Sequence, residues 1–196
     1  MDETPISAGK SSFDLVNWQR VLPELGLDDG IVLVDIAGGA GNYALAIAEA
    51  SAGKGMIHSF DLWRQGVDEL SRRSAAAGFK NIRAEVADVS KRIPLPEHSV
   101  DACLIATAFH DLVEAGAGEG ALAEVSRVLK AGGRLVVIEF KKMEGPPGPP
   151  ISIRLSPEEL DRKILPLGFR KGKTIEAGTH LYLSTYFKTA GPPGTG

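Results

Sequence analysis

The stretch VDIAGGAGNYA, residues 34–44, decides the architecture of this chain. It begins at the end of a short β-branched apolar run, residues 31–36, which is typical of a buried strand, and it leads into a helix predicted over residues 43–50. Glycines between a strand and a helix let the backbone approach a ligand closely, and the helix start adds unpaired N–H groups with a partial positive charge. The pattern therefore predicts a ligand-binding turn at the carboxyl end of a strand.

Outward from this turn, strand-like and helix-like segments alternate. Further strands are expected over residues 56–60, 82–86, 100–106 and 134–140, and helices over residues 67–77 and around Leu122 to Leu129. Gly78 is expected to end the first of these helices, and Gly132-Gly133 the second. Such alternation indicates a parallel sheet with helices on both faces.

The two ends of the chain carry different patterns. Ser156-Pro157-Glu158-Glu159 is a capping box that predicts a helix, which Pro166 would end. Two strands are expected around residues 173–177 and 181–188, and they are antiparallel because the connection is too short for a crossover. About residues 11–25, from Phe13 to Leu25, predict a helix ahead of the sheet, which would act as a lid over a ligand crevice. The Gly/Pro clusters, residues 145–150 and 191–196, indicate loop or disorder.

Length and composition limit the possible functions. The chain has 196 residues, which predicts one domain over residues 1–190 with a flexible tail, 191–196. Its 22 Lys and Arg against 25 Asp and Glu give a net charge of −3, so no basic excess points to nucleic acid. The single cysteine, Cys103, excludes an internal disulfide. No apolar leader and no apolar run of about 20 residues is present, so we expect a cytoplasmic protein with no membrane span.

Two classes of ligand compete for the glycine turn. Residues 39–44 fit the dinucleotide pattern G-x-G-x-x-G/A. However, Asp35 at the end of the first strand would lie close to a pyrophosphate and repel it. A cationic ligand such as S-adenosylmethionine, with its sulfonium and ammonium groups, would instead be attracted. The acidic residue therefore favours the second class.

Several motifs then resemble one family in order. Residues 34–41 resemble motif I of the class I methyltransferases, acidic-x-Gly-x-Gly-x-Gly, and depart from it at Ala37. Further resemblances follow at residues 60–62, 87–89, 93–101 and 129–135, the last being similar to the "LkpGGrl" turn of that family. The match covers about residues 30–188 and is most similar to the small ubiquinone/menaquinone-biosynthesis-type methyltransferases.

The resemblance implies a fold and a cofactor. The fold is α/β, a seven-stranded Rossmann-like sheet that is mostly parallel, with a C-terminal antiparallel hairpin and helices on both faces. The cofactor is S-adenosylmethionine, converted to S-adenosylhomocysteine. Asp61 would accept hydrogen bonds from both ribose hydroxyls, and Leu62 would pack on adenine. Asp88 would accept a hydrogen bond from the exocyclic amine of adenine. The full set of expected cofactor-binding residues is Asp35, Ala37, Gly38, Gly39, Gly41, Asp61, Leu62, Asp88, Val89 and Ala106.

The candidate base is His110, because no other histidine follows a predicted strand at its carboxyl end. An ordinary imidazole pKa of about 6.5 suits a base near neutral pH. The string Phe-His-Asp-Leu, residues 109–112, is similar to the His-Asp-Trp string of plant-type O-methyltransferases, whose histidine is the base. The alternative is that His110 caps the following helix or packs under the lid. Lys141-Lys142 after the fifth strand would neutralise an anionic substrate or lie in a solvated loop.

These features together predict a methyltransferase that acts on oxygen or carbon of a small organic acceptor, without a metal. A non-catalytic methyltransferase-like binding module is one alternative. A nicotinamide-dependent oxidoreductase is another, although the chain offers neither a substrate domain nor a Tyr/Lys catalytic pair. Acceptor contacts would come from the N-terminal helix, the Pro-rich loop 143–150 or a second subunit in a homodimer.

Overall fold

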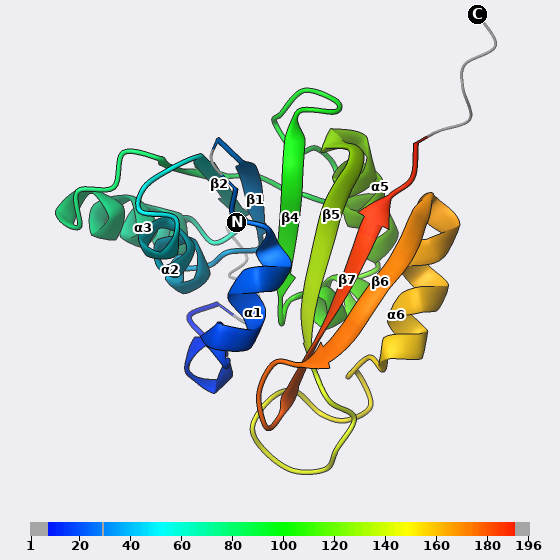
Figure 1. Cartoon of the computed structure of the whole chain (residues 1–196). Helices are drawn as coiled ribbons and strands as arrows, with labels where there is room; N and C mark the ends of the chain where they lie inside the picture. The colour runs from blue at the N-terminus through cyan, green and yellow to red at the C-terminus, as the bar shows by residue number, and fades with distance from the viewer. Residues whose placement is uncertain (1–7, 29, 191–196) are drawn as a thin grey trace, which may run out of the picture.

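The structure is a computed structural model that describes residues 8–28 and 30–190, so the predicted tail, 191–196, lies outside the described residues. Seven strands form one sheet in the order β3-β2-β1-β4-β5-β7-β6 (Figure 1). The first five are parallel to one another, and β7 is antiparallel to both β5 and β6. The strands are β1 (Val32–Ile36), β2 (Met56–Asp61), β3 (Ile82–Val86), β4 (Val100–Ala106), β5 (Leu129–Phe140), β6 (Phe169–Glu176) and β7 (Leu181–Lys188). The predicted mostly parallel sheet with its C-terminal antiparallel hairpin is confirmed.

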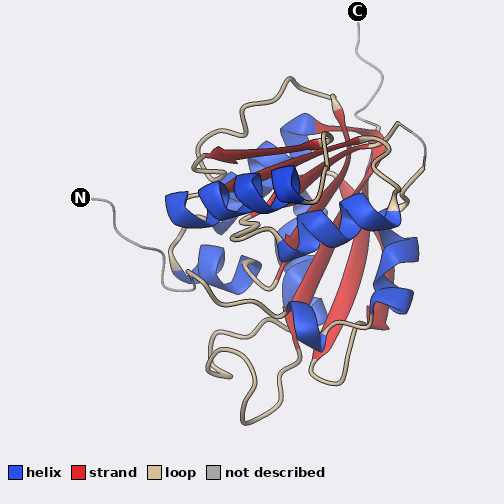
Figure 2. Ribbon diagram, turned by 90° about the vertical axis from the view of Figure 1, so that its left-hand side faces the viewer, coloured by secondary structure: helices blue, strands red, loops and turns tan. Residues whose placement is uncertain are grey.

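Helices cover both faces of the sheet (Figure 2). They are α1 (Trp18–Leu25), α2 (Asn42–Ala50), α3 (Arg64–Ala76), α4 (Phe109–Glu114), α5 (Gly118–Val128) and α6 (Pro157–Ile164), with short 3₁₀ turns η1 (Phe13–Leu15) and η2 (Leu165–Leu167). Successive strand residues point to opposite faces. Val34 and Ile36 therefore share a core with α4, α5 and α6, whereas Leu33 belongs to the core under α1, α2 and α3.

Several predicted elements differ from the structure, among them β5 and β6, which begin at Leu129 and Phe169 rather than at residues 134 and 173. The helix expected from Phe13 to Leu25 is broken, because Val16 is extended and the N–H of Asn17 donates to the carbonyl of Ala177 at 2.6 Å. The helix α5 ends at Val128 rather than at Gly132-Gly133. These glycines instead form an irregularity inside β5, where Leu129 pairs with Val100 but Arg134 already pairs with Ala102. The capping box is confirmed, since the Ser156 hydroxyl accepts the N–H of Glu159 and the Glu159 carboxylate accepts the N–H of Ser156.

The Pro-rich loop after β5 is organised around the guanidinium of Arg154, whose residue is only 3% exposed. Its five N–H groups donate at 2.7–3.1 Å to the carbonyls of five alternate residues, Lys141, Met143, Gly145, Pro147 and Pro149. The ring of Phe140 lies 5.6 Å from the guanidinium carbon. The cluster expected as loop or disorder is therefore a loop, and one buried cation fixes its path.

We expect Arg154→Lys to loosen this loop, because an ammonium offers three donors where the guanidinium offers five. The free energy of unfolding should fall by about 2 kcal/mol, since at least two carbonyls lose a charged donor. Tryptic cleavage after Lys142 should become faster. Urea unfolding and a timed digest measure the two effects. Arg162→Lys on the exposed side of α6 is the control, and equal changes in both variants would contradict the assignment.

Candidate cofactor and acceptor site

The loop between β1 and α2 has an alternating left-handed backbone. Ala37, Gly39 and Gly41 have φ values of 55°, 56° and 77°. An L-residue in this region is strained, so Ala37 carries a conformational cost where a glycine would not. Gly38 is required for lack of space, because a Cβ there would lie 2.2 Å from Ser59 Oγ and 2.5 Å from Asp35 Oδ2. The loop therefore lies directly on the side chains at the ends of β1 and β2.

Asp61 ties this loop to the end of β2. Its Oδ2 accepts the N–H of Gly39 at 2.8 Å, and its Oδ1 accepts the N–H of Trp63 at 2.7 Å. Each carboxylate oxygen keeps a second lone pair that could accept a hydroxyl proton. A Cβ on Gly39 would meet no atom within 4 Å, so the loop is open above that residue. The two predicted cofactor residues thus meet at an open surface.

Asp35 lies below the loop and is 1% exposed. Burial raises the pKa of its carboxyl to about 7, the charge of Asp61 adds to this rise, and a hydrogen bond from Ser59 opposes it. A carboxyl with that pKa is ready to ionise when positive charge arrives nearby. Asp35 is therefore separated from solvent by the loop, and its predicted contact with a cationic ligand stays a prediction.

The expected adenine-side residues lie at the ends of β2 and β3. Leu62 is 56% exposed and Val86, at the end of β3, is 39% exposed, whereas Val89 is buried in the core. Asp88 accepts hydrogen bonds from the Ser90 N–H and hydroxyl and pairs with Lys91 at 2.9 Å. Its slight burial would raise its pKa, but these partners lower it, so the carboxylate is charged. Leu62 and Val86 are thus exposed apolar side chains at the ends of two neighbouring strands.

A hydroxyl cluster lies over the ends of β1 and β4. Ser12 Oγ is 2.7 Å from both Tyr43 Oη and Thr107 Oγ1. Phe13 and Trp18 pack on the Tyr43 ring at centroid distances of 5.5 and 5.6 Å. Thr107 directly follows Ala106 and has a φ of 50°, which is rare for a β-branched residue and is commonest at functional sites. The N-terminal segment thus packs on Tyr43 and Thr107 at this edge, and its role as a lid stays a prediction.

His110, the predicted base, is held by a carboxylate that the sequence analysis missed. Its Nδ1 lies 2.8 Å from Glu139 Oε2, its backbone N–H donates to Glu139 Oε1 at 3.0 Å, and its Nε2 lies 3.5 Å from Asp111 Oδ1. His110 is 4% exposed and Glu139 is fully buried. Burial alone would lower the pKa of His110, but the hydrogen bond and charge of Glu139 outweigh it and the net shift is upward. The only signal in the sequence was a single acidic residue within the apolar run 135–140.

The two lysines after β5 are both paired. Lys141 Nζ lies 2.7 Å from Glu176, and Lys142 Nζ lies 2.8 Å from Glu159. Within residues 8–28 and 30–190, no group of three or more His, Cys, Asp or Glu side chains could hold a metal ion. Over the same ranges, no helix is both long and apolar enough to cross a membrane.

The sequence was compared with known families and curated proteins. A family profile described as a methyltransferase domain matches residues 33–133. The ubiquinone/menaquinone biosynthesis C-methyltransferase UbiE of Azotobacter vinelandii is 35% identical over 130 residues, which are 64% of this chain and 49% of that protein. UbiE of Ectopseudomonas mendocina is 29% identical over 174 residues, 85% of this chain and 62% of that protein. The chain spans about half the length of most of the curated relatives it matches.

Solved structures give a similar result. A SAM-dependent methyltransferase from Aquifex aeolicus superposes with a TM-score of 0.81 at 29% identity, covering 90% of this chain and 92% of that one. A putative type 11 methyltransferase from Sulfolobus solfataricus has a TM-score of 0.74 at 22% identity, with coverages of 92% and 96%. The second likeness concerns the fold alone.

We expect Asp35→Asn to remove a pH dependence of stability. The pKa of Asp35 is higher in the folded chain than in the unfolded chain, so folding takes up a proton between about pH 4 and pH 7. Wild-type stability should therefore fall as pH rises through this window, by about 2 kcal/mol relative to Asp35→Asn between pH 5 and pH 8. Urea unfolding at several pH values measures the difference. Asp68→Asn on α3 is the control, and parallel curves for wild type and Asp35→Asn would contradict the assignment.

We expect His110 and His58 to titrate on opposite sides of the ordinary imidazole pKa. Glu139 holds the pKa of His110 above that value, while burial holds the pKa of His58 below it. NMR titration of the histidine rings measures both. Glu139→Gln should move the His110 midpoint to lower pH and leave that of His58 in place. A His110 midpoint that Glu139→Gln does not move would show that the pair is not ionic.

Proposed function

Because the chain belongs to the methyltransferase domain family of class I S-adenosylmethionine-dependent enzymes, we propose that it transfers a methyl group from S-adenosylmethionine to oxygen or carbon of a small organic acceptor. The observation that carries this proposal is the bond between Asp61 and the glycine loop. It joins an acidic residue at the end of β2 to a left-handed glycine turn at the end of β1, beside an open surface.

The residues at this edge suit the cofactor in charge and hydrogen-bonding capacity. Asp61 has lone pairs for the ribose hydroxyls, and the exposed side chain of Leu62 supports an adenine face. S-adenosylmethionine supplies a methyl carbon bound to a positively charged sulfur. Asp35 lies below the loop as a counter-charge that ionises near neutral pH, and Gly38 allows that close approach. Ala37, Gly41, Asp88, Val89 and Ala106 complete the proposed cofactor set.

His110 is the proposed base for an acceptor that must lose a proton. Glu139 orients its ring through Nδ1, as a carboxylate does in a His–Asp pair, and Nε2, which lies 3.5 Å from Asp111 Oδ1, is the atom proposed to take the proton. Because the pKa of His110 is raised, the neutral form that can accept a proton is favoured only above the ordinary imidazole range. Transfer to such an acceptor should therefore become faster as pH rises through the raised pKa.

Alignment is the main task of the other residues. Methyl transfer is an in-line displacement with a good leaving group, and holding two reactants in line contributes roughly 7–11 kcal/mol. A carbon acceptor is supported by the names of the curated relatives, which are C-methyltransferases. The net charge of −3 supports a small molecule rather than a nucleic acid. We also propose that the protein acts in the cytoplasm. A second subunit in a homodimer would supply further contacts to the acceptor.

We expect calorimetric titration to show micromolar binding of S-adenosylmethionine and S-adenosylhomocysteine and no binding of NAD. Asp61→Ala should weaken the first two at least about tenfold, a loss of about 1.4 kcal/mol, because it removes the ribose acceptor and the support of Gly39. Asp61→Asn keeps one acceptor oxygen and should weaken binding less. Asp68→Ala on α3 should leave affinity unchanged.

Other outcomes would favour the alternatives. An NAD signal without a response to the other two ligands would support an oxidoreductase. Binding of S-adenosylhomocysteine without methyl transfer to any member of a phenol, quinol and carboxylate panel would support a non-catalytic module.

A further inference from the structure

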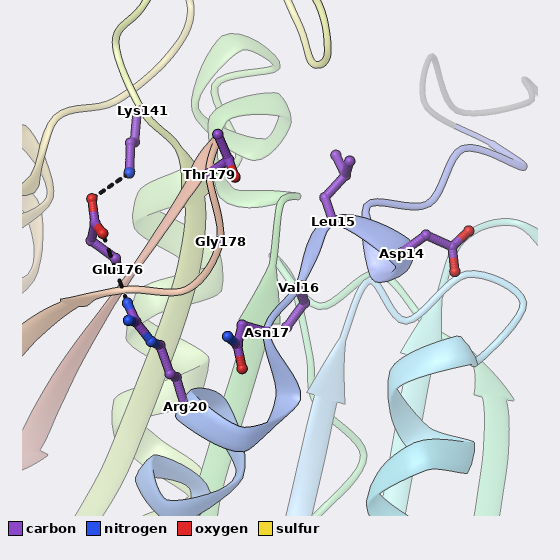
Figure 3. A pocket seen from close by; sticks show the side chains of 9 residues that line it. All are labelled: Asp14, Leu15, Val16, Asn17, Arg20, Lys141, Glu176, Gly178 and Thr179. Atoms are coloured by element: carbon purple, nitrogen blue, oxygen red, sulfur yellow. Dashed lines mark hydrogen bonds and ion pairs between the residues drawn. The ribbon is translucent and has the colours of Figure 1, made fainter.

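A hollow of about 560 Å³ lies beside the carboxyl end of β5 (Figure 3). Its walls are the η1–α1 segment, Lys141 just beyond β5, and the turn between β6 and β7. The loop and Asp61 lie at β1 and β2, so the proposed cofactor takes one half of the carboxyl edge. The hollow lies in the other half, beside the ends of β5 and β6, and none of the proposed cofactor residues lines it.

The frame of the hollow is fixed by backbone contacts. The Asn17 N–H donates to the Ala177 carbonyl at 2.6 Å, and the Lys141 N–H donates to the His180 carbonyl at 2.9 Å. Gly178 packs so closely on the Leu15 carbonyl that a Cβ would lie 2.1 Å from it. The walls are therefore preformed, which reduces the ordering cost of binding.

Two cations from separate elements meet in the hollow on one carboxylate. Glu176 Oε1 lies 2.7 Å from Lys141 Nζ, and its Oε2 lies 3.7 Å from Arg20 Nη1. Figure 3 shows the Glu176 carboxylate between these two side chains, with the Asn17 amide nearby and Asp14 pointing away. The arrangement is that of a carboxylate held at both oxygens, one by each cation.

The carboxylate that fills this position is easily replaced. The Glu176 side chain is 68% exposed, and exposed ion pairs contribute little to stability. Lys142, one residue later, instead pairs with Glu159 at the start of α6 and does not line the hollow. Lys141 is thus the member of the pair that faces the hollow.

We propose that Arg20 and Lys141 bind a carboxylate group of the methyl acceptor in this hollow, and that Glu176 occupies the same position until the acceptor arrives. The acceptor is then a small carboxylic acid. This inference rests on the proposed function for the identity of the reaction, but the binding site itself is defined by the hollow and its two cations. The Asn17 amide and the Thr179 hydroxyl line the hollow and supply further hydrogen-bond donors.

The test is calorimetric or NMR titration of Glu176→Gln with benzoate, with benzamide as the uncharged analogue. The variant should bind benzoate about fivefold more tightly than wild type, because the site is then always available rather than for part of the time. Adding Lys141→Met should abolish the gain, and adding Lys142→Met, the matched control, should preserve it. Benzamide should not bind any variant.

Two results would overturn the proposal: no benzoate binding to Glu176→Gln at tens of millimolar, or a gain that survives Lys141→Met. Titration of the same proteins with S-adenosylhomocysteine separates this failure from failure of the proposed function. Cofactor binding without benzoate binding rejects only the acceptor site, and benzoate binding without cofactor binding rejects only the methyltransferase assignment.

Discussion

The hydrogen bond from the Gly39 N–H to the Asp61 carboxylate joins the two strand ends on which the site is built. It fixes a left-handed turn after β1 against the end of β2, and it orients the same carboxylate by a second bond to the Trp63 N–H. This left-handed turn also covers Asp35 and shields it from water. The hydrogen bond between Gly39 and Asp61 therefore fixes the Asp61 carboxylate, and the turn that it holds buries Asp35, whose pKa rises because of that burial.

The other half of the edge depends on a different kind of contact. Glu139 at the end of β5 binds the backbone and ring of His110 at the start of α4, so a buried hydrogen-bonded pair connects β5 to the turn after β4. Burying polar groups is costly unless they are hydrogen-bonded, and each member of this pair has the other as a partner. The contact between β5 and α4 is thus polar, whereas the two cores on the sheet faces are apolar.

The strands and the glycine turn were predictable because they depend on local patterns. Runs such as residues 82–86 and 100–106 became strands with the predicted limits, and the capping box at Ser156 began a helix as expected. The break at Val16 and the early end of α5 were not predictable, because distant partners such as the Ala177 carbonyl decide them. The same holds for the site. The position of Asp61 at the end of a strand could be predicted from the local pattern. The contacts of Glu139 with His110 and of Glu176 with Arg20 could not, because they join residues far apart in sequence.

The loop around Arg154 has a consequence for how the chain tolerates change. The carbonyls that hold the guanidinium belong to alternate residues from Lys141 to Pro149, so the loop is recognised through its backbone and not through its side chains. Exposed positions such as Met143 and Ile151 are free to vary without altering the path of the loop. Insertion or deletion of a single residue, in contrast, would move the carbonyls beyond it out of phase. Evolution can thus change the side chains of this loop one by one, but it cannot easily change the length of the loop.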